Sequence, residues 1–180
     1  MTSLALRSAV LSLMLSAPFA IGTASAQGKD DKDSKAVSAY TLTMPKYRKL
    51  MQAMLNIGKA AQKDSALGSA IEDSGNKSLD QMTAAYNSKP QIRNAIAAAG
   101  LTSREFSVGL MALLQTGMSY GLMKQYKMTA DSVHKATGVS VANLEFYRAN
   151  EAEIDRMTKQ MEAQMPKDSS SGEARDSSGT

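Results

Sequence analysis

The sequence predicts an all-α protein: an irregular helical bundle of three longer and two or three short helices, with disordered termini. Three observations favour this class. Apolar residues recur at spacings of three and four along most of the chain. Ser or Thr precedes such runs at the capping-box distance from Glu or Gln, and no stretch alternates apolar and polar residues as a half-buried strand does. We therefore expect a single helical domain at residues 43–165.

Residues 1–26 have the pattern of a signal peptide. Arg7 provides the positive charge, a short apolar stretch follows it, and Ala24-Ser25-Ala26 matches the small-x-small cleavage pattern. We expect cleavage after Ala26 and a periplasmic or secreted bacterial protein; the alternative is an uncleaved N-terminal anchor. The sequence has no Cys, so the expected export is not accompanied by disulfides or by a lipidated N-terminus.

The first helix of the domain is expected after a polar leader. Residues 27–42 begin with QGKDDKDSK, which carries charges and little to bury, so we expect a flexible polar leader. Thr43 then has the position of an N-cap, and Pro45 falls in the first turn, where its missing N–H costs nothing. The apolar residues that follow lie on one helical face, which predicts a helix over residues 45–62.

Two short helices are expected in the middle of the chain. The capping-box patterns Ser78–Gln81 and Ser88–Gln91 predict helices over residues 79–86 and 90–99. Gly100 follows the second helix at the position where a helix end favours a left-handed residue. The two helices on either side of Gly100 are joined by so few residues that they must meet at a corner.

The central helix is predicted over residues 102–124. It begins with the capping-box pair Thr102 and Glu105, and no charged residue occurs over residues 106–123. A helix that is apolar on most of its circumference is surrounded by other helices or lies in lipid. Because the neighbouring amphipathic helices need an apolar partner, we expect a core helix rather than a membrane span.

A row of glycines along the central helix marks the expected interaction surface. Gly109, Gly117 and Gly121 lie on one row, although each Gly inside a helix costs about 1 kcal/mol relative to Ala. Close approach by a crossing helix explains the row; the alternative is relaxed selection in a marginally packed protein. With Tyr120 and Tyr147, the row would form a groove against the last helix that binds a protein partner or a small apolar ligand.

The last long helix is expected over residues 141–164, with Ser140 as its N-cap. A short helix over residues 130–136 is expected in the polar connection that precedes it. Residues 166–180 are polar after a proline and are expected to form a disordered tail.

The inventory of reactive side chains argues against an enzyme. The chain has no Cys and a single His, His134, and a lone histidine in a polar connection is most often a surface residue. Lys and Arg number 21 against 17 Asp and Glu, a balance that does not favour nucleic-acid binding. We expect no catalytic residues, no cofactor, no nucleic acid and no stable transmembrane span after signal cleavage. A second copy of the chain, in a homodimer, is one partner we consider.

Methionine provides the alternative function. The pairs Met51–Met54 and Met157–Met161 lie at helical spacings, and thioethers are soft ligands that suit Cu(I) or Ag(I). A periplasmic protein without Cys would have to use Met or His for such an ion. The plainer interpretation is that these residues fill an irregular core.

Two segments resemble small exported helical proteins of bacteria. The residues that carry the resemblance are the AI-x-x-AGLT-x-RE-F corner at residues 95–106 and the N-x-x-FY-x-x-N segment at residues 143–150. The resemblance covers the middle and end of the domain. It implies a helical fold and a cell-envelope setting, but no activity, substrate or site residue.

Overall fold

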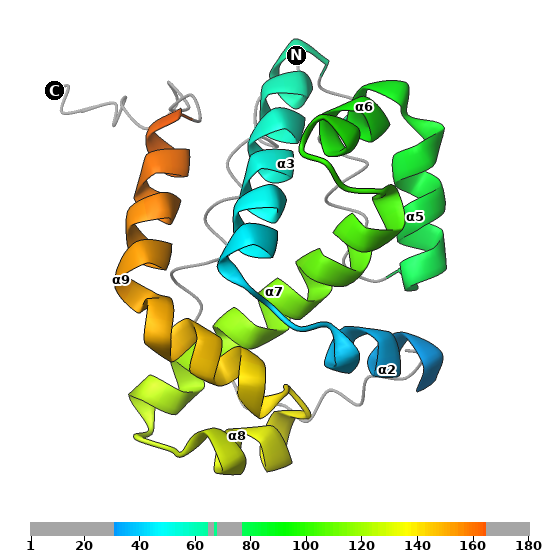
Figure 1. Cartoon of the computed structure of the whole chain (residues 1–180). Coiled ribbons are helices and arrows are strands. Elements are labelled where there is room, and N and C mark those ends of the chain that lie inside the picture. Colours follow the sequence, from blue (N-terminus) through cyan, green and yellow to red (C-terminus); the bar gives the residue numbers. More distant parts are fainter. Residues whose placement is uncertain (1–30, 65–66, 68–76, 165–180) are drawn as a thin grey trace, which may run out of the picture.

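The computed structural model describes residues 31–64, 67 and 77–164, and it confirms the all-α class, with no strand in these ranges (Figure 1). Within these ranges the three longer helices are as expected, and four short helices accompany them where two or three were expected. The expected signal peptide and tail lie outside the described residues. The helices are α2 (Asp31–Ala39), α3 (Met44–Lys63), α5 (Leu79–Ser88), α6 (Pro90–Ala98), α7 (Ser103–Gln125), α8 (Ala130–Thr137) and α9 (Val141–Gln164).

Helix α7 is the centre of the fold. It crosses the molecule diagonally in Figure 1, and each of the other six helices contacts it. The long uncharged stretch of the sequence is therefore a helix surrounded by other helices. Within the described ranges, no helix combines the length and the apolar character that crossing a membrane requires.

Capping explains where most helices begin. The boxes at Ser78–Gln81 and Thr102–Glu105 are both formed, with each side chain accepting a hydrogen bond from the other residue's backbone N–H. The third predicted box is wrong. Lys89 is the N-cap of α6 without a side-chain cap, and the Ser88 hydroxyl donates to the Ala85 carbonyl at 2.8 Å instead. Ser88 is still the last residue of α5, so its side chain bonds backwards.

Gly100 makes the corner between α6 and α7. Its φ of +72° is in the left-handed region, as expected. The Gly100 N–H donates to the Ala97 carbonyl at 2.9 Å and the Leu101 N–H to the Ile96 carbonyl at 3.4 Å. These two bonds are the Schellman arrangement, which satisfies the last carbonyls of α6 and turns the chain into α7.

Helix α2 corrects the prediction of a flexible leader for residues 31–39, whereas residues 27–30 lie outside the described residues. Asp33 and Val37 are buried although the surrounding sequence is polar. The Asp33 Oδ2 accepts a hydrogen bond from the Leu79 N–H at 2.7 Å, at the first residue of α5. A carboxylate at a helix N-terminus is stabilised by the helix dipole, so α2 is held by a contact from a distant part of the chain.

Helices α3 and α6 pack antiparallel. The Asn56 Nδ2 donates to the Ala95 carbonyl at 3.1 Å, and the Lys49 Nζ donates to the Gly100 carbonyl at 3.4 Å. Higher numbers on α3 therefore match lower numbers on α6. The C-terminal end of α3 lies at the N-terminal end of α6.

The buried side chains form two hydrophobic clusters. The larger one draws residues from α2, α3, α5, α6, α7 and α9. The smaller one lies where the end of α7 meets α8 and the start of α9. Tyr147 of α9 packs against both clusters, so it lies where the two join.

Candidate functional site

The predicted groove between the glycine row and α9 is filled by aromatic side chains. The Tyr147 ring lies 5.7 Å from the Tyr120 ring and 6.0 Å from the Phe146 ring, measured between centroids. Phe146 in turn lies 6.4 Å from Tyr47 of α3. Burial raises the pKa of Tyr147 well above its ordinary value. Tyr120 and Tyr147 are therefore brought together as predicted, but as parts of a packed junction.

The three glycines of the row meet different surroundings. A Cβ at Gly109 would lie 2.8 Å from Leu50 Cδ2 and 2.9 Å from Tyr40 Oη, so the surroundings of this glycine are closely packed. A Cβ at Gly117 would lie 3.3 Å from Tyr147 Oη, a tight contact. A Cβ at Gly121 would meet nothing within 4 Å, so the prediction of close packing is wrong at this position. The approaching groups at the first two are side chains rather than the backbone of a crossing helix.

A polar contact closes the aromatic junction on its outer side. The Tyr120 hydroxyl donates to Glu151 Oε2 at 3.0 Å, and Lys124 forms an ion pair with Glu151 Oε1. The hydrogen bond from Lys124 lowers the pKa of Glu151, while burial and the bond to Glu151 raise the pKa of Tyr120. Near neutral pH the carboxylate stays charged and the phenol neutral, an arrangement that ties α7 to α9.

Asn143 clamps the segment that connects α2 to α3. Its Oδ1 accepts a hydrogen bond from the Leu42 N–H at 2.8 Å, and its Nδ2 donates to the Tyr40 carbonyl at 2.8 Å. The Asn143 N–H donates to the Ser140 hydroxyl at 3.2 Å, which confirms Ser140 as the N-cap of α9. The segment between α2 and α3 is not helical, so its backbone groups lack helical hydrogen-bond partners. The buried Asn143 amide supplies partners for two of them.

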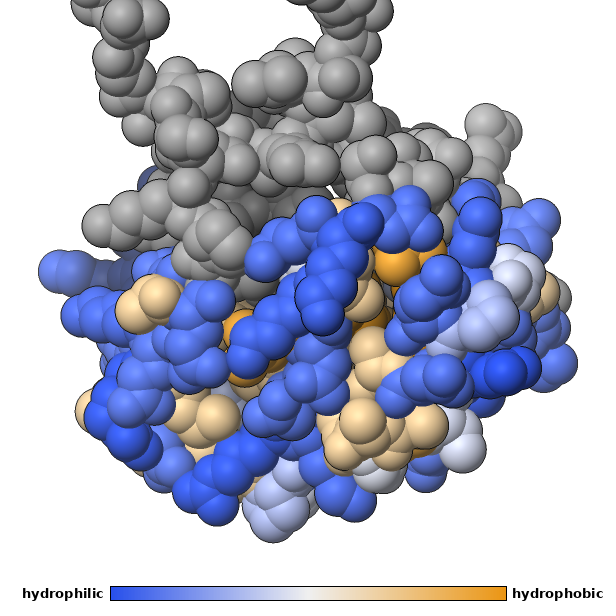
Figure 2. All heavy atoms as spheres, turned by 90° about the horizontal axis from the view of Figure 1, so that it is seen from above, coloured by the Kyte–Doolittle hydropathy of each residue, from blue (hydrophilic) through white to orange (hydrophobic). Residues whose placement is uncertain are grey.

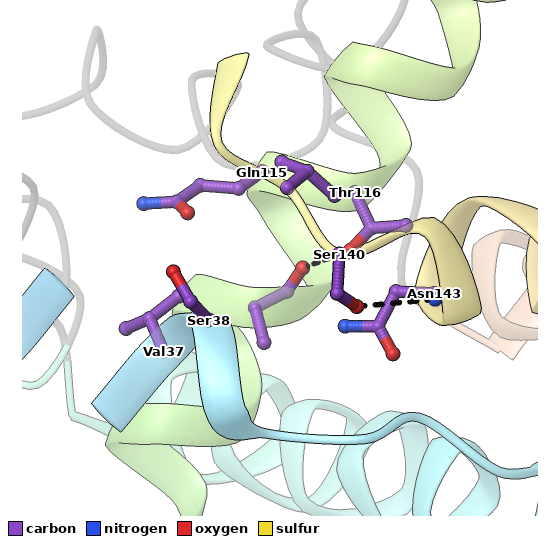
Figure 3. Close-up of a pocket in the computed structure, with 8 residues that line it drawn as sticks. Val37, Ser38, Gln115, Thr116, Ser140 and Asn143 are labelled. Carbon is purple, nitrogen blue, oxygen red and sulfur yellow. Dashed lines mark hydrogen bonds between the residues drawn. The ribbon is translucent and has the colours of Figure 1, made fainter. Parts of the chain in front are cut away.

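Two small pockets lie in the described part of the chain, and neither has room for an organic ligand. The pocket in Figure 3 lies between α2, α7 and the start of α9 and has room for about one water molecule. A second pocket, beside Asp33 and Lys77, is of similar size. The lining of the first pocket is Val37, Ser38, Ala112, Gln115, Thr116, Val139, Ser140 and Asn143.

The four methionines proposed as metal ligands belong to the core. Met51 and Met161 are buried in the larger hydrophobic cluster, and Met54 and Met157 pack against it half-buried. Helices α3 and α9, which carry them, contact each other. Core filling therefore accounts for all four positions, and binding of Cu(I) or Ag(I) stays a prediction.

His134 has a local partner. Its Nδ1 lies 2.8 Å from the Val139 carbonyl oxygen, which can only accept, so Nδ1 carries a proton and donates it to that carbonyl. Gly138, with φ of +75°, lies between the two residues and ends α8. This hydrogen bond closes the short connection between α8 and α9.

An exposed apolar surface lies along the second half of α7. Met118 is 59% exposed and Tyr126 is 54% exposed, whereas Leu114 and Leu122 are half-buried. These residues are four apart, so they lie on one row of the helix. Met128, 36% exposed, follows the end of α7, and Gly121 adds open space beside Met118. We name Leu114, Met118, Leu122 and Tyr126 the apolar row.

Sequence reasoning missed Asn143 and the apolar row for different reasons. Asn143 precedes Leu144 on the buried side of an amphipathic helix. A polar residue among buried positions was the feature of the sequence that could have indicated its role. The apolar row has no such signal, because α7 is apolar on all sides and the sequence alone does not show which side stays uncovered.

No family model matches the chain, and neither a curated protein nor a solved structure matches it. A function is therefore inferred from the surfaces that the described residues expose. Among the described residues, the exposed large hydrophobic side chains are Met118 and Tyr126 of the apolar row and Met128, which follows α7.

Proposed function

We propose that the protein is a non-enzymatic binding protein of the bacterial cell envelope, and that it recognises another protein through the apolar row of α7. The observation that carries this proposal is the exposure of Met118 and Tyr126. Within the described ranges the exposed large hydrophobic residues are these two and Met128, and all three fall within residues 118–128. A gathered apolar patch on a polar surface is typical of an interaction site.

The geometry of the row favours a helical partner. Its four residues extend over three helical turns, about 18 Å at 1.5 Å per residue. An amphipathic helix with apolar residues at i, i+4 and i+7 could lie along it, as in helix-in-groove recognition. Met118 suits such a contact because its unbranched thioether side chain adapts to different neighbours. The small size of these two pockets favours a protein over the small apolar ligand that was the other expectation.

Site-specific photo-crosslinking tests the proposal in cells of the source bacterium. A photoreactive amino acid in place of Met118 should give one discrete protein adduct. The same amino acid in place of Ala84, an exposed residue of α5, should not give it. Adding Tyr126→Asp should abolish the adduct, because a carboxylate interrupts the row while the exposed position tolerates it.

Two outcomes would contradict the proposal. Identical adducts from the two positions would indicate non-specific capture. An adduct that survives Tyr126→Asp would place the contact outside the row. An adduct with twice the mass of the chain would identify the partner as a second copy.

A further inference from the structure

Helices α3 and α6 carry cations without acids. Helix α3 has five Lys or Arg residues and no Asp or Glu. Helix α6 contains Arg93 and no acid, and Lys89 precedes it as the N-cap. By contrast, α9 mixes five acids with three cations. The α3–α6 pair is therefore the most cationic part of the described fold.

The three cations at the N-terminal end of α3 are occupied within the molecule. Lys46 donates to the Thr41 carbonyl at 2.9 Å and lies over the Tyr40 ring. Arg48 pairs with Glu153 at 2.6 Å, and Lys49 donates to the Gly100 carbonyl. These contacts explain the basic turn at residues 46–49 as part of the fold.

The four cations at the other end have no such partners. Lys59 and Lys63 lie on the exposed row of α3 that continues from Asn56, whose side chain contacts α6. Among the described residues, no ion pair or side-chain hydrogen bond engages Lys59, Lys63, Lys89 or Arg93. We name these four residues the cationic end.

The antiparallel packing of α3 and α6 brings these four residues to one end of the molecule. From the contact between Asn56 and Ala95, Lys63 is seven residues onward and Lys89 six residues back, about 10 Å along each helix. This end is uppermost in Figure 1. Figure 2 views the molecule from that side, and hydrophilic residues cover most of its coloured area.

Helix stability does not account for the cationic end. Lys63 is favourable at the C-terminus of α3, where the helix dipole is negative. Lys89 and Arg93 are unfavourable at the start of α6, where the dipole is positive and the first turn has no acid. Two cations in a disfavoured place, beside two more that form no ion pair with any described residue, indicate a role outside the fold.

We propose that the cationic end binds the surface of a bilayer that contains anionic phospholipids. Charge complementarity carries the proposal, because the antiparallel packing of α3 and α6 brings these four cations to one end of the molecule and neither helix carries an acid. Near such a surface each Lys or Arg contributes about 1 kcal/mol, or about fivefold in binding. A single-stranded nucleic acid fits less well, since stacking needs exposed aromatic rings and the exposed aromatic residue of the described part, Tyr126, belongs to the far end of α7.

Vesicle co-sedimentation with the full chain tests this. Vesicles of equimolar phosphatidylcholine and phosphatidylglycerol should pellet the protein more strongly than pure phosphatidylcholine vesicles, which measure binding through apolar segments such as residues 1–26. The variant Lys59→Gln/Lys63→Gln should bind the anionic vesicles about thirtyfold more weakly. The matched control Lys135→Gln/Lys159→Gln removes the same charge from exposed positions on α8 and α9 and should bind within about twofold of wild type. Lys59→Arg/Lys63→Arg should retain binding, and added salt should weaken it.

Three results would overturn the proposal. Equal binding to neutral and anionic vesicles would remove the role of charge. An equal loss in the control variant would indicate net charge rather than the cationic end. Displacement from the vesicles by a single-stranded oligonucleotide at the same phosphate concentration would make the lipid assignment wrong.

Discussion

At the scale of single residues, the glycines of α7 show how the surroundings decide the effect of one methyl group. Gly109→Ala should lower the free energy of unfolding by about 1–2 kcal/mol, after the gain in helix propensity is included. The new Cβ would lie 2.8 Å from the buried Leu50 side chain. Urea denaturation followed by circular dichroism measures the change.

Gly121→Ala is the matched control on the same row. Nothing lies within 4 Å of its added Cβ, so the helix-propensity gain of about 0.5–1 kcal/mol should appear undiminished. The same denaturation experiment compares the two variants. If both change stability in the same direction, the tight contact at Gly109 does not limit packing.

Removing the Asn143 side chain should destabilise the protein more than removing Asn150, another polar residue of α9. Asn143→Ala leaves the buried Leu42 N–H and the Tyr40 carbonyl without partners, which should cost about 1–3 kcal/mol. Asn150→Ala removes a bond only to the Phe146 carbonyl of its own helix and should cost less than about 1 kcal/mol. Equal thermal shifts for the two variants would contradict the clamp.

Glu105 should make the stability depend on pH in a defined direction. Hydrogen bonds from the Thr102 backbone N–H and hydroxyl hold the pKa of Glu105 below its ordinary value. The contribution of the Glu105 carboxylate to the stability of the fold is therefore complete above its pKa in the unfolded state. This contribution is lost as the pH falls through its pKa in the folded state. At neutral pH the free energy of unfolding of wild type should exceed that of Glu105→Gln by about 0.3–1 kcal/mol. The value is small because the carboxylate is exposed.

The measurement is the difference in unfolding free energy between wild type and Glu105→Gln across the acidic range. This difference should shrink on acidification because the protonated carboxyl resembles the amide. A difference that stays constant would show that the charge of Glu105 does not matter.

At the scale of helices, α2 is tied to a distant part of the chain through Asp33, which accepts a hydrogen bond from the Leu79 N–H. Asp33→Ala removes the bond to the Leu79 N–H and the contact with Arg104, and should cost about 1–2 kcal/mol. Hydrogen exchange followed by mass spectrometry should show faster exchange over residues 31–39 while α7 stays protected. Ser34→Ala, at an exposed neighbour, is the control and should leave the exchange unchanged.

Helices whose stabilising features are local could be predicted from the sequence. Helix α9 was expected over residues 141–164 and has those bounds, and α7 was located by its capping box and uncharged stretch. Helix α2 could not be predicted, since its polar sequence is helical through tertiary contacts at Asp33 and Val37. The predicted cap of α6 is wrong for a local reason, because the Ser88 hydroxyl donates to the Ala85 carbonyl in α5.

The candidate site was predictable only in part, because the sequence does not show how the neighbouring helices pack around α7. The pairing of Gly117 with Tyr147 follows from a small residue facing a large one on the neighbouring helix. The row pattern assigned the same role to Gly121, but α9 does not cover that position. Spacing identifies the residues that share a helix face, whereas only the packing of the other helices determines which part of that face stays open.

At the scale of the whole molecule, the two proposed surfaces lie at opposite ends. The cationic end is uppermost in Figure 1, whereas the end of α7 that carries Tyr126 lies near α8 at the bottom. Met118→Asp should therefore leave vesicle binding unchanged, and Lys59→Gln/Lys63→Gln should leave the crosslinked adduct unchanged, because separated sites act independently. Co-sedimentation and crosslinking of both variants measure this. Loss of both readouts in either variant would indicate one shared surface.

The Asn143 clamp has a consequence for how the chain reaches its native state. The amide pairs with residues that precede it by 101 and 103 positions. A chain that emerges from its N-terminus onward therefore carries the segment between α2 and α3 with open backbone groups until the start of α9 arrives. Contacts of such separation slow folding. We expect this segment to be the last part of the N-terminal half to become resistant to proteases, and nascent chains that stop before α9 to be cut there.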